Sequence, residues 1–267
     1  MTSPQPQHGR PRQSQSLKQQ YEEFILQRIE EFKDQISRAD LLAIADDAVR
    51  ELEMGTEEQL VLTEVLLLEH VDRLIIRRLR LPAYRRWRDR HVRLRRAQKQ
   101  PTHWGLDPAT PLVKLVERVE EDDLSLVVGA AHAPAAFYLA AHDVPVLLID
   151  PELQAVEAAE TRAAAEAISA RFQAAVVSFG TWFPEVAPAL VILDPALLAR
   201  LDPAARQAAL GTMRECTIPG GTHLILPTEQ PNGVTPLGPE ALQAGYKGWS
   251  VDKPRRGRPV WFTATKP

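Results

Sequence analysis

Residues 124–150 read LSLVVGAAHAPAAFYLAAHDVPVLLID, and this stretch decides the fold. Two short and continuously apolar runs, 124–129 and 144–150, flank an alanine-rich segment that is predicted as a helix near 133–142. Apolar strands that alternate with helices indicate a parallel sheet covered on both faces. The stretch therefore predicts the first strand–helix–strand unit of an α/β domain.

The same alternation continues to the end of the chain. Further strands are predicted at 174–179, 189–194 and 222–226, with helices at 152–171 and 203–215. The last two apolar runs, 246–251 and 258–265, flank a basic turn, which predicts an antiparallel hairpin at the edge of the sheet. We expect a single α/β domain over residues 112–267.

A ligand site is expected where the first strand meets its neighbours, because open parallel sheets bind ligands beyond the carboxyl ends of their strands. The loop after the first strand starts at Gly129 and leads into a helix whose N-terminal amides can face an anion. Asp150 ends the second strand and can accept hydrogen bonds from both hydroxyls of a ribose. The pair indicates a nucleoside-containing cofactor, and the alternative for Asp150 is a helix cap before Pro151.

The order of several segments resembles a class I S-adenosylmethionine-dependent methyltransferase domain over residues about 110–267, somewhat more than half of the chain. The matching segments are LSLVVGAAHAPAAFYLA, VPVLLIDPELQAVEAAE, PALVILDPALLARL, IPGGTHLIL, GYKGWSV and RPVWFTATKP. The resemblance implies a Rossmann-like fold with a mostly parallel seven-stranded sheet and a C-terminal antiparallel hairpin. An NAD-type Rossmann domain is the rival reading, against which the hairpin and the Pro-Gly-Gly turn argue.

The resemblance also implies a set of cofactor-binding positions, which are Gly129, Ala131, Asp150 and Thr181. S-adenosylmethionine is the implied cofactor, and no metal is implied. The chain departs from the family where loop glycines are replaced by Ala131 and Ala133, and where acidic residues are missing after the first and third strands. Side chains in this loop hinder close approach of a ligand to the backbone. These departures predict a degraded cofactor site in which binding is weakened or lost.

Catalytic candidates are weak. Asp194-Pro195 faintly resembles the Asp/Asn-Pro-Pro-aromatic motif of amine methyltransferases, but the second proline and the aromatic residue are absent. His132, in the loop after the first strand, is the other candidate. The plain alternatives are a helix N-cap for Asp194 and a solvated loop residue for His132.

The chain before the α/β domain is expected to comprise a polar tail (1–16), a helical region (17–98) and a connector (99–111). The tail has too few apolar residues to fold alone. Charge segregates in the helical region, since residues 18–72 hold fifteen Asp/Glu against five Lys/Arg, a net of −10, and residues 73–100 hold twelve against one, a net of +11. We therefore expect a docking surface made of Arg77, Arg78, Arg80, Arg85, Arg86, Trp87, Arg88 and Arg90.

Three interpretations of this arginine-rich segment remain open. It can neutralise the acidic helices that precede it, it can dock with the tail on an acidic protein or an anionic membrane surface, or it can bind nucleic acid phosphates. The net charge of the whole chain is −3, which makes nucleic acid the weakest of the three.

Composition excludes several classes of protein. A single cysteine, Cys216, excludes an internal disulfide and a cysteine-rich zinc site. No secretory signal and no apolar span is recognised, so a cytoplasmic protein is expected, with a membrane-surface location if the arginines meet lipid. The sequence predicts a non-catalytic accessory subunit of a larger assembly. An active methyltransferase on a small molecule or protein is the alternative, and an RNA-binding or RNA-modifying protein is the second alternative.

Overall fold

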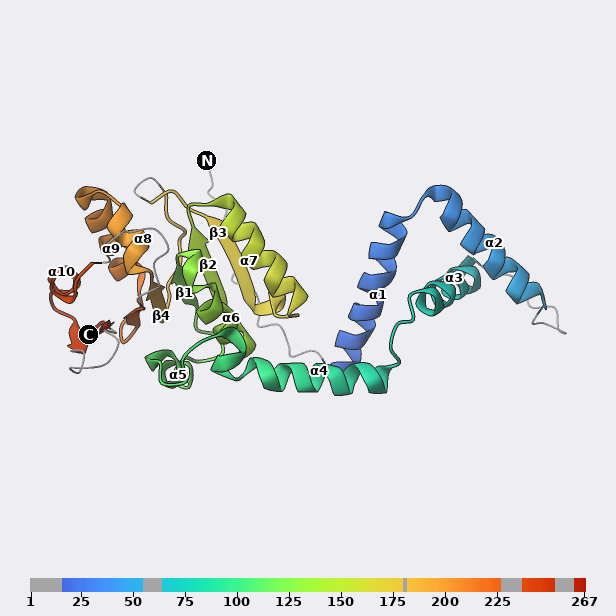
Figure 1. Ribbon diagram of the computed structural model, residues 1–267, viewed down its shortest axis with the longest axis horizontal. Helices are drawn as coiled ribbons and strands as arrows, with labels where there is room; N and C mark the ends of the chain where they lie inside the picture. Colours follow the sequence, from blue (N-terminus) through green and yellow to red (C-terminus); the bar gives the residue numbers. More distant parts are fainter. Residues whose placement is uncertain (1–15, 55–63, 180–181, 227–236, 253–261) are drawn as a thin grey trace, which may run out of the picture. The chain divides into compact units, whose positions relative to one another are not determined.

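A computed structural model of the chain describes residues 16–54, 64–179, 182–226, 237–252 and 262–267. The chain divides into two compact units, Met1–Leu94 and Arg95–Pro267 (Figure 1). We refer to them as the helical unit and the sheet unit.

The sheet unit is built on a seven-stranded sheet with the order β3-β2-β1-β4-β5-β7-β6. Its parallel strands are β1 (Ser125–Val128), β2 (Val146–Asp150), β3 (Phe172–Val176), β4 (Leu190–Leu193) and β5 (Thr222–Ile225). The last two strands, β7 (Phe262–Thr265) against β5 and β6 (Ser250–Asp252) against β7, pair antiparallel. The predicted mostly parallel seven-stranded sheet with C-terminal antiparallel strands is confirmed, while the turn within residues 253–261 lies outside the described residues.

Helices cover both faces of this sheet, which explains why its strands are apolar on both sides. Val127 of β1 belongs to a core layer with α5 (Pro111–Val116), α6 (Ala133–Ala141) and α7 (Leu153–Ala165). Its neighbours Leu126 and Val128 belong to the opposite layer, with α8 (Pro195–Arg200), α9 (Pro203–Cys216) and α10 (Pro239–Gly245). Successive side chains of β1 therefore point to opposite faces of the sheet and pack in the two different core layers.

Some elements differ from the sequence-based prediction. The third strand starts at Phe172 instead of 174, because α7 ends at Ala165, Ala167 turns the chain with a φ of 55°, and the 3₁₀ helix η3 (Ser169–Arg171) follows. The helices α8 and α10 were not predicted. Both are short, and short apolar runs do not distinguish a helix from a strand.

The helical unit contains α1 (Leu17–Gln35), α2 (Arg38–Met54) and α3 (Glu64–Arg78). Ser37 with Asp40 three residues later is a capping pattern in the sequence, and the structure confirms the cap, because the Ser37 Oγ accepts a hydrogen bond from the Asp40 amide at 3.1 Å. The sequence also indicates a helix stop at Gly55 and a cap at Thr56, and both residues lie outside the described residues. The buried core of this unit is small and consists of Ile29, Ile44, Ala48, Val71, Leu74 and Ile75.

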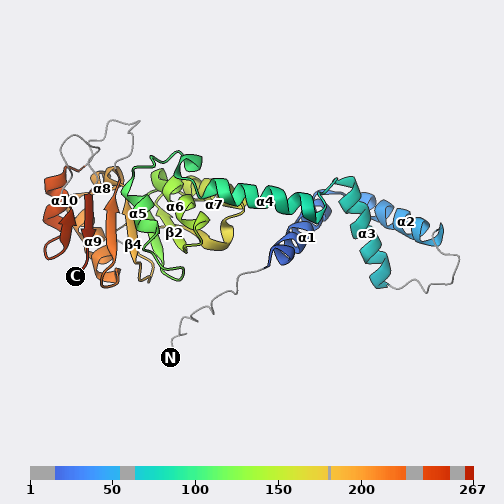
Figure 2. The ribbon, with the colours of Figure 1, turned by 90° about the horizontal axis from the view of Figure 1, so that it is seen from below.

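A single continuous helix, α4 (Tyr84–Gln98), begins in the helical unit and ends in the sheet unit (Figure 2). Its Trp87 packs against Tyr21 and Phe24 of α1, with ring centroids 5.4 and 6.1 Å apart. Within the predicted connector 99–111, the 3₁₀ helix η1 (Pro101–Trp104) carries a Trp104 that packs against Phe137 in the sheet-unit core. None of the described helices is both long and apolar enough to cross a membrane.

Candidate functional site

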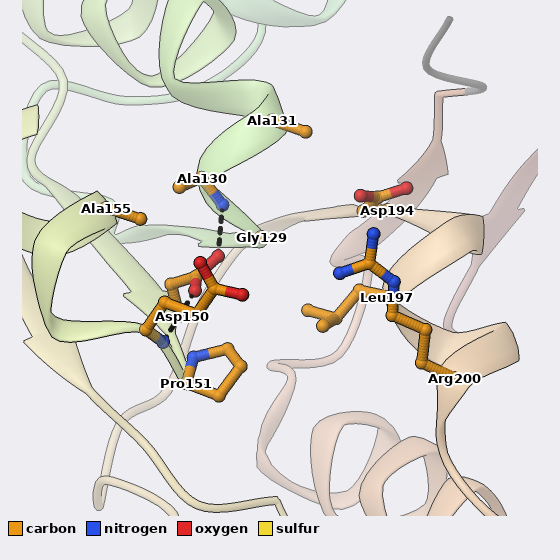
Figure 3. A pocket seen from close by; sticks show the side chains of 10 residues that line it. Gly129, Ala130, Ala131, Asp150, Pro151, Ala155, Asp194, Leu197 and Arg200 are labelled. Carbon is orange, nitrogen blue, oxygen red and sulfur yellow. Dashed lines mark hydrogen bonds between the residues drawn. The ribbon is translucent and has the colours of Figure 1, made fainter. Parts of the chain in front are cut away.

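A cavity of about 210 Å³ lies at the carboxyl ends of β1, β2 and β4 (Figure 3). The loop after β1 contributes Gly129 and Ala131, the end of β2 contributes Asp150, and the start of α8 contributes Asp194. β1 pairs with β2 on one side and with β4 on the other, so the cavity lies at the switch point of the sheet, where ligands are expected. The fold therefore brings four of the sequence-predicted site residues to one place.

Asp150 connects two of the loops around this cavity. Its Oδ2 accepts a hydrogen bond from the Ala130 amide at 2.6 Å, and its Oδ1 accepts one from the Glu152 amide at 2.8 Å (Figure 3). Asp150 lines the cavity, and it is not the helix cap of the alternative interpretation, because the N-cap residue of α7 is Glu152. Each carboxylate oxygen has a second lone pair, so the side chain can still accept a hydrogen bond from a ligand hydroxyl.

The loop after β1 passes close to the start of α8. Gly129 has a φ of +103°, and a Cβ on this residue would lie 2.9 Å from the Cβ of Asp194. Only glycine accommodates both the backbone conformation and the approach. The approach brings Gly129 and Asp194, which both line the cavity, close together.

Asp194 and His132 are both buried, with exposed fractions of 6% each. The Oδ1 of Asp194 accepts a hydrogen bond from the Ala196 amide at 2.8 Å and caps α8. This confirms the helix N-cap that was the alternative to a catalytic role. Burial lowers the pKa of His132, and the nearby charge of Asp194 opposes that shift. Burial therefore favours the neutral form of His132 beside Asp194. The alternative of a solvated loop residue is wrong, because His132 is buried. His132 is not among the residues that line the cavity.

Two charged residues of the cavity wall, Glu152 and Arg200, were not predicted from the sequence. The Arg200 side chain extends from the end of α8 toward the cavity, beside Leu197 (Figure 3), and it makes no ion pair with any residue that the structure describes. The signal that could have found it is the Asp194-Pro195 pair, a capping residue followed by a proline at the first helical position. The predicted cofactor contact Thr181 lies outside the described residues.

The volume of the cavity limits what it can hold. Binding pockets for small molecules and cofactors usually span about 300–1,000 Å³, whereas this one measures about 210 Å³. The side chains that line the cavity thus leave a volume below the usual range for such pockets. No group of three or more His, Cys, Asp or Glu residues with the arrangement of a metal site occurs in the described part of the chain.

The predicted docking residues fall into three groups. On α3, Arg77 pairs with Glu51 of α2 and Arg78 pairs with Asp47 of α2. These two arginines of α3 thus neutralise acidic residues of the preceding helix. Arg80 lies in the turn that follows. Of the predicted docking residues on α4, Arg85, Arg86, Arg88 and Arg90 are exposed, with Arg88 paired to the adjacent Asp89.

Trp87 differs from the expectation of a docking residue. It is 8% exposed and stacks on His91, in addition to its contacts with α1. The sequence places it among arginines, but the helix turns it to the opposite side, onto the aromatic residues of α1. It is therefore a packing residue and is not available to a membrane surface.

Several solved structures are similar to this chain. They include the N-methyltransferase NodS from Bradyrhizobium japonicum WM9, at 15% identity over 67% of this chain and 96% of that chain, with a TM-score of 0.46. The glycopeptide N-methyltransferase MtfA complexed with S-adenosyl-L-homocysteine matches at 16% identity over 61% of this chain and 91% of that chain, with a TM-score of 0.48.

A TehB-like SAM-dependent methyltransferase from Corynebacterium glutamicum ATCC 13032 Kitasato matches at 14% identity over 68% of this chain and 94% of that chain, with a TM-score of 0.47. No protein-family model and no curated protein matches the chain. The strand order of the sheet unit therefore carries the fold assignment.

Proposed function

We propose that this protein is a non-catalytic accessory subunit with a methyltransferase fold, and that it binds partner protein chains through its helical unit. The observation that carries the proposal is the small volume of the cavity at the switch point, about 210 Å³. A site that cannot hold a complete methyl donor cannot transfer a methyl group, whereas a methyltransferase fold without that activity can still serve as a rigid body for assembly.

The contacts around the cavity give a physical reason for its size. The Ala130 amide, in the loop expected to face a cofactor, already donates its hydrogen bond to Asp150. The neighbouring Gly129 lies against Asp194. A shift of this loop away from Asp150 and Asp194 would give up both contacts. The loss of a buried hydrogen bond alone costs about 1–3 kcal/mol.

Calorimetric titration of the full chain with S-adenosylmethionine and S-adenosylhomocysteine tests this proposal. We expect no saturable heat up to millimolar ligand, while circular dichroism shows that the protein is folded. Asp150→Ala serves as the matched control, and its titration should look the same as that of the unmodified chain. Saturable binding that Asp150→Ala abolishes would contradict the proposal.

The second candidate function is an active methyltransferase, and one observation favours it. His132, held neutral by burial, and Asp194 lie together beside the cavity that Asp150 lines. Methyl transfer depends mainly on positioning of donor and acceptor, so a strong base is not required. Saturable binding in the titration above would favour this candidate over the accessory role.

A further inference from the structure

Most of the exposed large hydrophobic side chains of the described residues lie in the helical unit. Seven of ten belong to it, namely Leu26, Leu42, Met54, Val65, Leu68, Tyr84 and Val92. A single exposed apolar side chain is ordinary on a protein surface. The charged residues around each of them therefore decide which of these side chains belong to an interaction surface.

Two of these residues lie in charged rows of opposite sign. On α1, Leu26 is 56% exposed, with Glu22 and Glu30 four residues before and after it. On α4, Val92 is 49% exposed, with Arg88 and Arg96 at the same spacing. Residues four apart lie on one face of a helix. We call Glu22–Leu26–Glu30 the acidic row and Arg88–Val92–Arg96 the basic row.

Both rows point away from the contact between α1 and α4 within one chain. That contact uses Tyr21 of α1 and Trp87 of α4. Leu26 follows Tyr21 by five residues and Val92 follows Trp87 by five, so each row is turned by about 140° from its helix's packing side. The two rows of one chain therefore do not meet on the packed side.

Among the described residues, the charges of the rows pair with residues of their own helices. Glu22 pairs with Lys18 at 4.0 Å, Glu30 pairs with Lys33 at 2.9 Å, and Arg88 pairs with the adjacent Asp89 at 2.8 Å. Lys33 also pairs with Asp72 of α3, at 3.0 Å. Such exposed local pairs contribute about 0–1 kcal/mol and exchange easily. Arg96 makes no ion pair with any residue that the structure describes.

We propose that the occupant of both rows is a second copy of this chain, with the acidic row of each copy against the basic row of the other. A two-fold axis forms the contact twice and closes the dimer. In each contact a leucine meets a valine between flanking Glu–Arg pairs, the pattern by which helix pairs combine an apolar seam with flanking charges. This inference does not depend on whether the cavity of the sheet unit binds a cofactor.

A flat anionic membrane fits these observations less well. Helices that lie on membranes insert an apolar face, and the apolar side of α4 around Trp87 is already packed on α1. A nucleic acid would have to approach the basic row next to the acidic helices of the same unit. The acidic row, in contrast, matches the basic row in spacing, in charge and in its central apolar residue.

Sedimentation analysis of two charge-reversed chains tests the dimer. One chain carries Arg88→Glu with Arg96→Glu, and the other carries Glu22→Arg with Glu30→Arg. We expect the unmodified chain to dimerise at low salt, and each reversed chain to dimerise at least about tenfold more weakly. An equimolar mixture of the two reversed chains should form a heterodimer, because both contacts then join opposite charges again. That rescue also shows that both reversed chains are folded.

The matched control is Arg86→Glu with Arg90→Glu, which makes the same charge change on another side of α4. We expect its dimer to persist. A wild-type chain that stays monomeric, a mixture that does not associate, or a control as disruptive as the row variants would overturn the proposal. Binding of the monomer to phosphatidylserine vesicles or duplex DNA that Arg88→Glu with Arg96→Glu abolishes would overturn it as well, in favour of those partners.

Discussion

Gly129→Ala is expected to lower the free energy of unfolding of the sheet unit by about 3 kcal/mol. Two costs add at this position. A residue with a side chain rarely adopts a φ of +103°, and the new Cβ would lie 2.9 Å from the Cβ of Asp194. Asp194 cannot simply move away, because it caps α8 through the Ala196 amide. Urea denaturation followed by circular dichroism measures the loss.

Gly211→Ala is the control for this prediction. Gly211 lies inside α9, and a Cβ there would have no atom within 4 Å. Alanine is favoured over glycine within helices by about 0.5–1 kcal/mol, so this variant should be slightly more stable than the unmodified chain. Similar destabilisation by both substitutions would show that the approach of the loop to Asp194 is not the cause.

The location of the candidate site could be predicted from the sequence because local rules determine it. Apolar runs define β1 and β2, and the topology of a parallel sheet places the residues that end them, Gly129 and Asp150, at one edge. The size of the cavity could not be predicted in this way. It depends on how closely the β1 loop approaches the start of α8, and no local pattern gives the distance between two segments that are far apart in the sequence. Arg200 and Glu152 were missed for a related reason, since their side chains reach the cavity only after the helices around it are placed.

In the helical unit, the helices could be predicted from the sequence, but the burial of Trp87 could not. The stepping of apolar residues predicts its helices, but it does not tell which side of α4 is covered. Trp87 lies among arginines in the sequence, yet it is buried because three aromatic rings, Tyr21, Phe24 and Tyr84, surround it. A contact between residues more than sixty positions apart is a property of packing and leaves no local signal.

The core of the sheet unit contains a histidine that the sequence analysis did not single out. His223 on β5 is completely buried, with Nδ1 2.9 Å from the Tyr246 Oη and Nε2 2.8 Å from the Thr217 Oγ1. Thr217 donates its hydroxyl hydrogen to the Met213 carbonyl at 2.6 Å, so it accepts from the Nε2–H of His223. Tyr246 then donates to Nδ1. The polar atoms that link Tyr246, His223 and Thr217 all have hydrogen-bond partners only while the imidazole is neutral.

The free energy of unfolding should consequently decrease as the pH decreases, and His223 should account for part of this decrease. Burial, followed by the charge of Arg214, lowers the pKa of His223 from 6.5 to about 3. The unfolded chain therefore binds a proton below pH 6.5 that the folded chain refuses, so the stabilisation is complete above that pH and is lost as the pH falls toward 3. Between pH 7 and about pH 5 the loss amounts to about 2 kcal/mol.

Urea denaturation at the two pH values, on the unmodified chain and on His223→Gln, isolates this loss from that of other groups. His223→Gln should be less stable at pH 7, and its disadvantage should shrink by about 2 kcal/mol at about pH 5, because glutamine does not titrate. Tyr246→Phe is the matched control, since it removes one hydrogen bond but keeps the buried histidine. It should lower stability at both pH values and retain the pH dependence of the unmodified chain. A disadvantage of His223→Gln that stays constant with pH would show that His223 is not held neutral by the fold.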